Sequence, residues 1–268
     1  MPLAFIPNFE FPSLHLGPFV VQSFGVLAGL GIFLAVWIAS RTAKRDGQSD
    51  QVILDFAVVG VVSGVVAGHL AHLFLYHPEE LQGWAILRIW EGLSSMGGLF
   101  GGILAAVIWF RWKGIRFAPY ADALALGVAP GWGVARAGCF TVHDHPGVRT
   151  DFFLAVDFPS GPRHDLGLYE AVLLFALGAL LWALHRRGVL RGYLLSLLAL
   201  LYGLGRFGLD FLRTRELVDV GSTVMKPDAR YLGLTPAQYA ALMLIAWGTW
   251  RLATRRRDAG PSTTPAAG

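Results

Sequence analysis

YLLSLLALLYGLGRFGLDFLRTRE, residues 193–216, is an apolar segment whose charged side chains gather toward its end. Its apolar part has the length of about twenty residues that an α-helix needs to cross the hydrocarbon core of a bilayer. Arg206 and Asp210 lie inside this part. An ionisable side chain is costly at that depth and is a functional candidate by default. The segment predicts a membrane-spanning helix that carries polar chemistry.

Six further apolar runs have a similar character, although Asp122, Pro130 and several glycines interrupt the run near 119–136. The chain is 54% hydrophobic and 15% charged, whereas soluble domains carry about 25% charged residues. Its mean hydropathy is +0.53. We therefore predict an all-α, polytopic membrane protein with about seven transmembrane helices, near residues 19–39, 53–75, 94–110, 119–136, 167–184, 193–212 and 232–250.

These runs predict a single transmembrane helical domain over residues 1–253. Residues 141–166 are polar and rich in Pro and Gly, which predicts a periplasmic loop with a short hairpin. Residues 254–268 predict a disordered, basic cytoplasmic tail. The lone Cys139 excludes a disulfide framework within the chain, and no Cys/His spacing indicates a metal site. No basic stretch with interleaved aromatic residues indicates a nucleic-acid partner.

The basic residues follow every second apolar run. Thirteen of the 22 Lys and Arg residues lie after the first, third, fifth and seventh runs: Arg41, Lys44, Arg45, Arg111, Lys113, Arg116, Arg186, Arg187, Arg191, Arg251, Arg255, Arg256 and Arg257. Because cytoplasmic loops are enriched in Lys and Arg, the N-terminus is predicted outside and the C-terminus in the cytoplasm. The net charge of +4 therefore indicates topology.

Four polar residues of the sixth run lie on one helical stripe: Tyr202, Arg206, Asp210 and Arg213. Their steps of 4, 4 and 3 place them on the same face. One interpretation is that Arg206 and Asp210 pair only to lock the bundle. The other is that Arg213 leaves uncompensated positive charge, which suits an anion.

Two other segments carry polar groups. GWGVARAGCFTVHDHPG, residues 131–147, contains Arg136, Cys139, His143, Asp144 and His145; RHDLGLYE covers residues 163–170. Each segment also has a purely structural interpretation. Arg136 is then a boundary residue that snorkels to the interface, and His164 and Asp165 form a helix cap. At a rise of about 1.5 Å per residue, Arg206 and Arg136 both lie about 20 Å or more from the cytoplasmic ends of their helices. Small residues on two of the runs let the helices pack closely. They are Gly60, Gly64 and Gly68 in the second run and Gly97, Gly98, Gly101 and Gly102 in the third. The residues predict a site for an anionic lipid headgroup in the outer leaflet.

Seven segments, in this order, resemble the bacterial prolipoprotein diacylglyceryl transferase family. They are FGVLAGLGIFLAVWIASRTA, AGHLAHLFLYHPE, WEGLSSMGGLFGG, ARAGCF with a later Gly, PRHDLGLYE, YGLGRF with DFLR, and GLTPAQ. The resemblance implies transfer of a diacylglyceryl group from phosphatidylglycerol to the lipobox cysteine thiol of a preprolipoprotein, in the bacterial cytoplasmic (inner) membrane. It implies neither a metal nor an organic cofactor.

The resemblance also implies roles for residues. Arg136 and Arg206 match the two essential arginines of the family, and His164 is our preferred catalytic base. The expected substrate-binding residues are Gly97, Gly98, Cys139, Asp144, Gly147, Arg163, Tyr169, Glu170, Tyr202, Asp210, Arg213 and Gln238. Arginine cations would stabilise the departing phosphate, while a base deprotonates the attacking thiol.

The chain departs from the family at four positions. Met96 stands where a His usually precedes the Gly pair, Phe24 replaces a Tyr, Cys139 an Asn, and Asp165 a Pro. These departures leave three alternatives: another base among His164, His143, His145 and Asp144, a different acceptor, or a protein that only binds anionic lipid. A transporter is disfavoured because no inverted repeat is found. Cys139 is either a nucleophile beside Arg136 or a small apolar filler.

Overall fold

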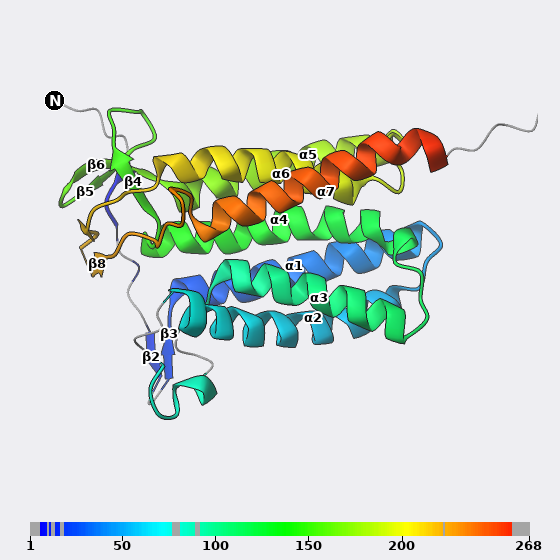
Figure 1. Ribbon diagram of the computed structural model, residues 1–268, viewed down its shortest axis with the longest axis horizontal. Coiled ribbons are helices and arrows are strands. Elements are labelled where there is room, and N and C mark those ends of the chain that lie inside the picture. Colours follow the sequence, from blue (N-terminus) through cyan, green and yellow to red (C-terminus); the bar gives the residue numbers. More distant parts are fainter. Residues whose placement is uncertain are drawn as a thin grey trace, which may run out of the picture.

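The computed structural model describes residues 6–9, 11, 14–16, 19–76, 81–88, 92–221 and 223–258. Its helices run along the long axis of the molecule, and its strands gather at one end of the bundle, here called the site end (Figure 1). The helices are α1 Ser23–Arg45, α2 Asp50–Ala71, α3 Ser95–Trp112, α4 Ala118–Val142, α5 Leu166–Arg186, α6 Leu194–Leu209 and α7 Pro236–Asp258. A π-helical turn, His72–Tyr76, extends α2, and 3-10 turns cover Ala85–Leu87 and Asp210–Leu212.

Five of these helical segments are long and apolar enough to cross a membrane: Ser23–Arg45, Asp50–Leu75, Ala118–Val142, Leu166–Arg186 and Leu194–Leu212. The apolar part of α3, Met96–Trp112, is shorter. α7 packs along α6, where a Cβ added at Gly248 would lie 2.6 Å from the carbonyl oxygen of Ser196. The prediction of a polytopic, mainly helical membrane protein is therefore confirmed.

Small residues let the helices of this bundle approach backbone to backbone. A Cβ at Gly131 of α4 would lie 2.5 Å from the carbonyl oxygen of Gly31 in α1. A Cβ at Gly101 of α3 would lie 2.6 Å from that of Ser63 in α2. Gly102, by contrast, has nothing within 4 Å. Since helices in lipid associate through close packing, these contacts stabilise the pairs α1–α4 and α2–α3.

The fourth apolar run, the weakest in the sequence, forms the unbroken helix α4. Its polar interruption is satisfied, because Asp122 accepts hydrogen bonds from the backbone N–H groups of Gly192 (2.5 Å) and Leu194 (3.0 Å). Its Pro130 packs against Gly178 of α5, where a Cβ would lie 3.3 Å from the proline Cδ. Because Gly178 has no side chain, α5 leaves room for the Pro130 ring, and α4 continues as a helix through this residue.

The all-α prediction needs a correction at the site end, where the chain also forms small sheets. The strands are β1 Ile6–Pro7, β2 Leu14–Leu16, β3 Phe19–Val21, β4 Pro146–Arg149, β5 Val156–Phe158, β6 Gly161–Asp165, β7 Val218–Asp219 and β8 Val224–Met225. β4, β5 and β6 lie in the expected loop, where β5 and β6 form the expected hairpin. The order of the largest sheet is β1-β5-β6-β4, with β1 parallel to β5. Pairing of β1 depends on contacts about 150 residues away in the chain, so local sequence does not reveal it.

At the other end of the chain, α7 continues to Asp258, past the start expected for the disordered tail. Residues 259–268 of that tail lie outside the described residues.

Candidate functional site

A buried carboxylate joins two arginines at the site end. Glu170, in the first turns of α5, is fully buried and accepts hydrogen bonds from Arg206 Nη1 of α6 (2.7 Å) and Tyr202 Oη (2.5 Å). Its other partner is Arg136 of α4, whose Nε lies 3.1 Å from Glu170 Oε1. Three helices therefore meet at one carboxylate. A snorkelling role for Arg136 is excluded, because its side chain is 2% exposed.

A second carboxylate extends the cluster along α6. Asp210 Oδ1 lies 3.1 Å from Arg206 Nη2 and 3.2 Å from Arg213 Nε. The Asp210 side chain also accepts a hydrogen bond from Thr235 Oγ1. The predicted stripe on the sixth run is confirmed, and its members Arg206, Asp210 and Arg213 are joined by ion pairs. We call Arg136, Arg206 and Arg213, with Glu170 and Asp210, the arginine cluster.

The expected uncompensated charge of Arg213 is corrected by the structure. Arg213 Nη1 donates to Asp228, which comes from the loop after β8 and is 25% exposed. The three buried arginines therefore have two buried carboxylates and one carboxylate at the rim. The sequence did not reveal this partner, because Asp228 lies 15 residues away outside any helical spacing.

Gln238 belongs to a helix cap beside the cluster. Its side-chain oxygen accepts from the backbone N–H of Thr235 (3.0 Å), while Thr235 Oγ1 accepts from the Gln238 backbone N–H (3.2 Å). This reciprocal pair is a capping box, for which TPAQ is the sequence signature. Thr235 was not among the predicted residues, although this signature identifies it. The cap fixes the start of α7 against Asp210.

Beyond the end of α4, a chain of polar groups leads away from Arg136. Arg136 Nη1 lies 3.5 Å from Cys139 Sγ, and the thiol interacts with the Asp144 carboxylate. Asp144 in turn contacts His145, whose Nδ1 lies 3.4 Å from Asp144 Oδ1 and 2.7 Å from its carbonyl oxygen. The structure therefore brings three of the predicted residues together with a histidine that was considered only as an alternative base.

Burial raises the pKa of Asp144 to about 7, although Arg136 acts in the opposite direction. The pKa of His145 lies well below 6.5, because burial and the charges of Arg213, Arg136 and Arg206 all disfavour the imidazolium. At neutral pH the His145 ring is therefore uncharged, and part of the Asp144 population is protonated.

Ligand atoms of Cys139, Asp144 and His145 lie within 4.8 Å of one another, a spacing compatible with a metal ion. The charge of their surroundings disfavours this use. Three arginines lie close enough to shift the protonation of His145. Since a divalent cation would be repelled by these guanidinium groups, the trio is better suited to an anionic or thiol ligand.

Arg163 and His164 of the segment 163–170 lie outside the arginine cluster and make other contacts. Arg163 is structural in its contacts: Nη1 donates to the Gly147 carbonyl (3.2 Å) and Nη2 to Glu216 (3.3 Å). His164 Nδ1 lies 2.9 Å from the hydroxyl of Tyr169, outside the arginine cluster. Only burial lowers the pKa of His164, and no charged group acts on it.

Gly147 is required by packing, because a Cβ there would lie 2.8 Å from the Leu212 carbonyl oxygen.

Asp165 caps α5, as the structural alternative predicted. Its Oδ1 accepts from the Leu168 backbone N–H (3.1 Å), and its Oδ2 lies 2.7 Å from His143 Nδ1. His143 ends α4 in the left-handed conformation, with φ of 50°. The rings of Phe9, Phe140 and Phe158 surround it. The pair of His143 and Asp165 was missed in the sequence because it joins two helix ends.

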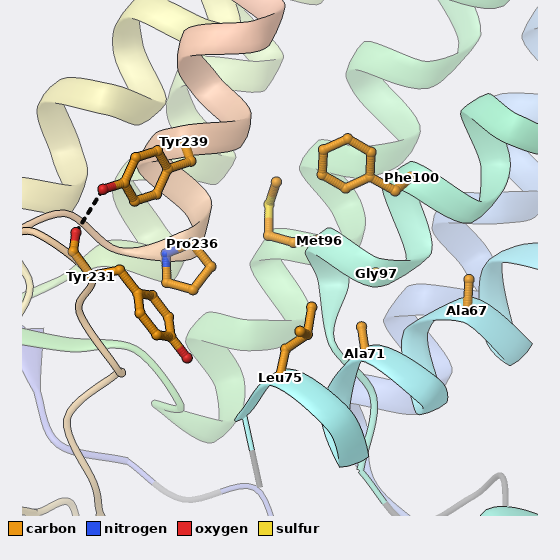
Figure 2. Close-up of a pocket in the computed structure, with 9 residues that line it drawn as sticks. All are labelled: Ala67, Ala71, Leu75, Met96, Gly97, Phe100, Tyr231, Pro236 and Tyr239. Carbon is orange, nitrogen blue, oxygen red and sulfur yellow. Dashed lines mark hydrogen bonds between the residues drawn. The ribbon is translucent and has the colours of Figure 1, made fainter. Parts of the chain in front are cut away.

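Met96 and Gly97 line an apolar pocket of about 520 Å³ between the start of α3, the end of α2 and the start of α7. Figure 2 shows the Met96 side chain pointing into this space, opposite Tyr231, Pro236 and Tyr239. Gly97 packs on α2, where a Cβ would lie 2.6 Å from the Ala67 carbonyl oxygen, and Gly98 faces Gly64. The two glycines therefore shape the wall of the pocket by close helix packing.

The pocket and the arginine cluster lie on either side of the first turn of α7. Pro236 and Tyr239 face the pocket, whereas the preceding Thr235 donates to Asp210. A molecule with a charged head and apolar chains matches this arrangement of a polar and an apolar region.

Comparison with known proteins points in one direction. A family model described as prolipoprotein diacylglyceryl transferase matches residues 12–254. The chain is 33% identical over 218 residues to the phosphatidylglycerol–prolipoprotein diacylglyceryl transferase of Chromohalobacter salexigens, covering 77% of this chain and 80% of that protein. It is 31% identical over 229 residues to transferase 1 of Streptomyces coelicolor, covering 81% and 67%. The Bacillus cereus B4264 transferase is 28% identical, with 81% and 86% covered.

Proposed function

Because the chain belongs to the prolipoprotein diacylglyceryl transferase family, we propose that it transfers a diacylglyceryl group from phosphatidylglycerol to the lipobox cysteine thiol of a preprolipoprotein. Its relatives are named for this activity. The observation that carries the proposal is the pair of buried guanidinium groups, Arg136 and Arg206, held by Glu170 beside an apolar pocket.

The proposed setting is the bacterial inner membrane, crossed seven times, with the N-terminus outside and the C-terminus in the cytoplasm. Five candidate spans, the shorter α3 and the long α7 supply the seven segments. The end of the bundle opposite the site carries cations stacked on aromatic rings, such as Arg186 over Trp182. Lys and Arg are enriched on the cytoplasmic side of membrane proteins, which supports a site in the outer leaflet.

Arg136 and Arg206 bind the phosphate oxygens of the lipid, and Arg213 supports them through Asp210. An arginine fork suits a phosphodiester because it offers several donors in one plane and keeps its charge. Buried Arg206 Nε has no hydrogen-bond acceptor among the described residues. A buried donor without a partner is costly, so a ligand oxygen at this position would satisfy it. Tyr202 donates to Glu170 and orients that carboxylate between the two arginines.

The acyl chains occupy the pocket beside Met96 and Gly97 (Figure 2). Its lining is almost wholly apolar. Met96 carries no titratable group and serves this apolar wall. The lipid then extends past the start of α7, with its phosphate at the arginine cluster.

The reaction needs a thiolate to attack the carbon of the diacylglyceryl group that is bonded to the phosphate oxygen. As the carbon–oxygen bond breaks, negative charge grows on the phosphate oxygen, where Arg136 and Arg206 stabilise it. Stabilising charge that develops only in the transition state raises the rate, whereas equal binding of both states does not.

A protein that only binds anionic lipid is the competing hypothesis, and Met96 favours it because a thioether cannot accept the thiol proton. The test uses purified protein, phosphatidylglycerol with a labelled headgroup, and a lipobox peptide. We expect a thioether-linked product and labelled glycerol phosphate in equal amounts, with no product from a Cys→Ser peptide. Retention of the lipid with neither product would contradict the transferase and support binding alone.

A further inference from the structure

Diacylglyceryl transfer, as proposed above, requires that the acceptor thiol lose its proton before its sulfur attacks carbon. We propose that Nε2 of His145 is the base that accepts this proton. The inference rests on the proposed function and identifies the proton acceptor that the sequence left open among four side chains.

The backbone of His145 is held in place on two sides. Its carbonyl oxygen accepts a hydrogen bond from the Leu166 backbone N–H at the start of α5 (3.0 Å). The next residue, Pro146, pairs with Asp165 in the sheet. His145 therefore connects the end of α4 to the start of α5, the two helices that contribute Arg136 and Glu170. A base must be fixed in this way to meet its substrate in a productive geometry.

The hydrogen bonds of His145 select the tautomer that can accept a proton. Nδ1 lies 2.7 Å from the carbonyl oxygen of Asp144. Since a carbonyl oxygen only accepts hydrogen bonds, Nδ1 carries the ring proton and Nε2 keeps its lone pair. Among the described residues, none bonds to Nε2. The side chain is 20% exposed, so a thiol can approach this nitrogen.

The charges around the ring support the same role. Burial and the charges of Arg213, Arg136 and Arg206 lower the pKa of His145, so the ring is neutral with an available lone pair, and the imidazolium it forms is acidic enough to pass its proton on to the departing phosphate. The Asp144 carboxylate, 3.4 Å from Nδ1, faces the ring from the same segment. The three guanidinium groups also favour a thiolate over a thiol at this place, because an adjacent cation stabilises the anionic sulfur.

The other three candidates fit the role less well. His164 bonds to Tyr169, and no charged group of the cluster affects its protonation. His143 is 2% exposed, and its Nε2 lies buried within a cage of phenylalanine rings. Asp144 directs a buried oxygen toward His145 and the thiol of Cys139, so it is better placed to orient than to meet a substrate.

In the proposed step, the S–H proton moves to Nε2 of His145 while the sulfur forms a bond with the phosphate-bearing carbon of the diacylglyceryl group. The bond between that carbon and the phosphate oxygen breaks, and its electron pair leaves with glycerol phosphate. The imidazolium then returns the proton to the departing phosphate oxygen. Atoms and charge balance without an oxidant, a reductant or a metal.

The test compares wild type with His145→Gln, using the phosphatidylglycerol and lipobox peptide assay at pH values from 6 to 10. We expect kcat to fall by about 100-fold or more at pH 7, with the KM for lipid unchanged. The deficit should shrink above about pH 8.5, where the peptide thiol ionises without help. Added imidazole should restore part of the activity of His145→Ala. His185→Gln, at the opposite end of the bundle, should behave as wild type.

Two results would overturn the assignment. One is a His145→Gln enzyme with wild-type turnover. The other is a deficit that stays constant across the pH range and is not rescued by imidazole, which indicates a structural role. His164→Gln provides the direct alternative: a pH-dependent deficit there, and none at position 145, would move the base to His164. An inactive wild type would overturn the proposed function and this assignment together, whereas an active wild type separates the two.

Discussion

The two ends of the helical bundle use arginine in different ways. At the end away from the sheets, arginines lie over aromatic rings: Arg41 is 4.6 Å from the ring centroid of Trp37, and Arg186 is 4.8 Å from that of Trp182. Arg251 lies over Tyr193 at 5.5 Å. Arg41 and Arg186 lie near the C-terminal ends of α1 and α5, and Arg251 lies in the second half of α7. Such cation–π pairs fix a guanidinium at an interface where it remains hydrated.

At the site end, the three arginines of the arginine cluster are buried and each one meets a carboxylate. Arg136 and Arg206 share Glu170, and Arg213 pairs with Asp210 and Asp228. Burying a charge is costly unless it is paired, and the pair often adds little net stability. We infer that the stacked arginines Arg41, Arg186 and Arg251, here called the belt, serve the orientation of the helices, whereas the arginine cluster serves the proposed reaction.

The largest effect is expected from removing the carboxylate that two arginines share. Glu170→Gln removes the carboxylate that Arg136 and Arg206 share in a buried site and leaves Arg206 with Asp210, which should cost about 3–5 kcal/mol of stability. The measurement is thermal or denaturant unfolding in detergent micelles. Glu216→Gln is the control: its side chain is 73% exposed and its ion pair with Arg163 should contribute less than about 1 kcal/mol. Equal losses in the two variants would show that the buried carboxylate contributes no more than an exposed one.

Removing one arginine of the cluster should affect turnover more than folding. Arg136→Ala is expected to lower kcat/KM by about 100- to 1,000-fold, because a guanidinium that stabilises the departing phosphate is lost. Arg41→Ala, which removes a stacked arginine, should leave turnover within about threefold. The assay is release of labelled glycerol phosphate. A full loss in Arg41→Ala would show that the belt also takes part in the reaction.

The Asp144 carboxyl should make stability depend on pH. Its pKa is raised from 3.8 to about 7 by burial, so between pH 4 and 7 the folded state binds more protons than the unfolded state. Stability contributed by this group is therefore present at low pH and lost as pH rises toward 7. Asp144→Asn should be more stable than wild type by about 1–3 kcal/mol at pH 8 and nearly equal at about pH 3.5, below the pKa of the unfolded state. A variant that is equally destabilised at both pH values would contradict this.

The smallest effect is expected at the belt. Arg186→Gln removes a cation stacked on Trp182 at the edge of the bundle. Exposed cation–π pairs contribute about 0.5–1 kcal/mol, so the unfolding free energy should change by no more than that. Unfolding in detergent would measure it. A loss above 2 kcal/mol would mean that stacked arginines support the fold as much as buried ones do.

Much of this architecture could be predicted from the sequence. The apolar runs locate the helices, because a run of about twenty residues can be recognised even where a single polar residue or proline interrupts it. The stripe from Tyr202 to Arg213 follows from helical spacing alone. The RHDLGLYE motif places Glu170 in an apolar run, although only the structure shows that it joins Arg136 to Arg206.

The parts that could not be predicted depend on contacts between distant segments. Asp228 as partner of Arg213, β1 as partner of β5, and the pair of His143 and Asp165 all join residues that no local period relates. The same reason explains why the sequence favoured His164 as the base. Its motif is conspicuous, but the proximity of His145 to three arginines appears only when α4 and α6 are packed.

In the proposed reaction, the planar fork of the buried arginines contributes beyond their charge. Arg206→Lys and Arg186→Lys both keep the positive charge, but only Arg206 uses two nitrogens on two carboxylates, Glu170 at 2.7 Å and Asp210 at 3.1 Å. The deciding measurement is the rate of thioether formation in these two variants beside wild type. We predict a loss of about 100-fold in Arg206→Lys and a near wild-type rate in Arg186→Lys. Equal rates in the two variants would contradict the account.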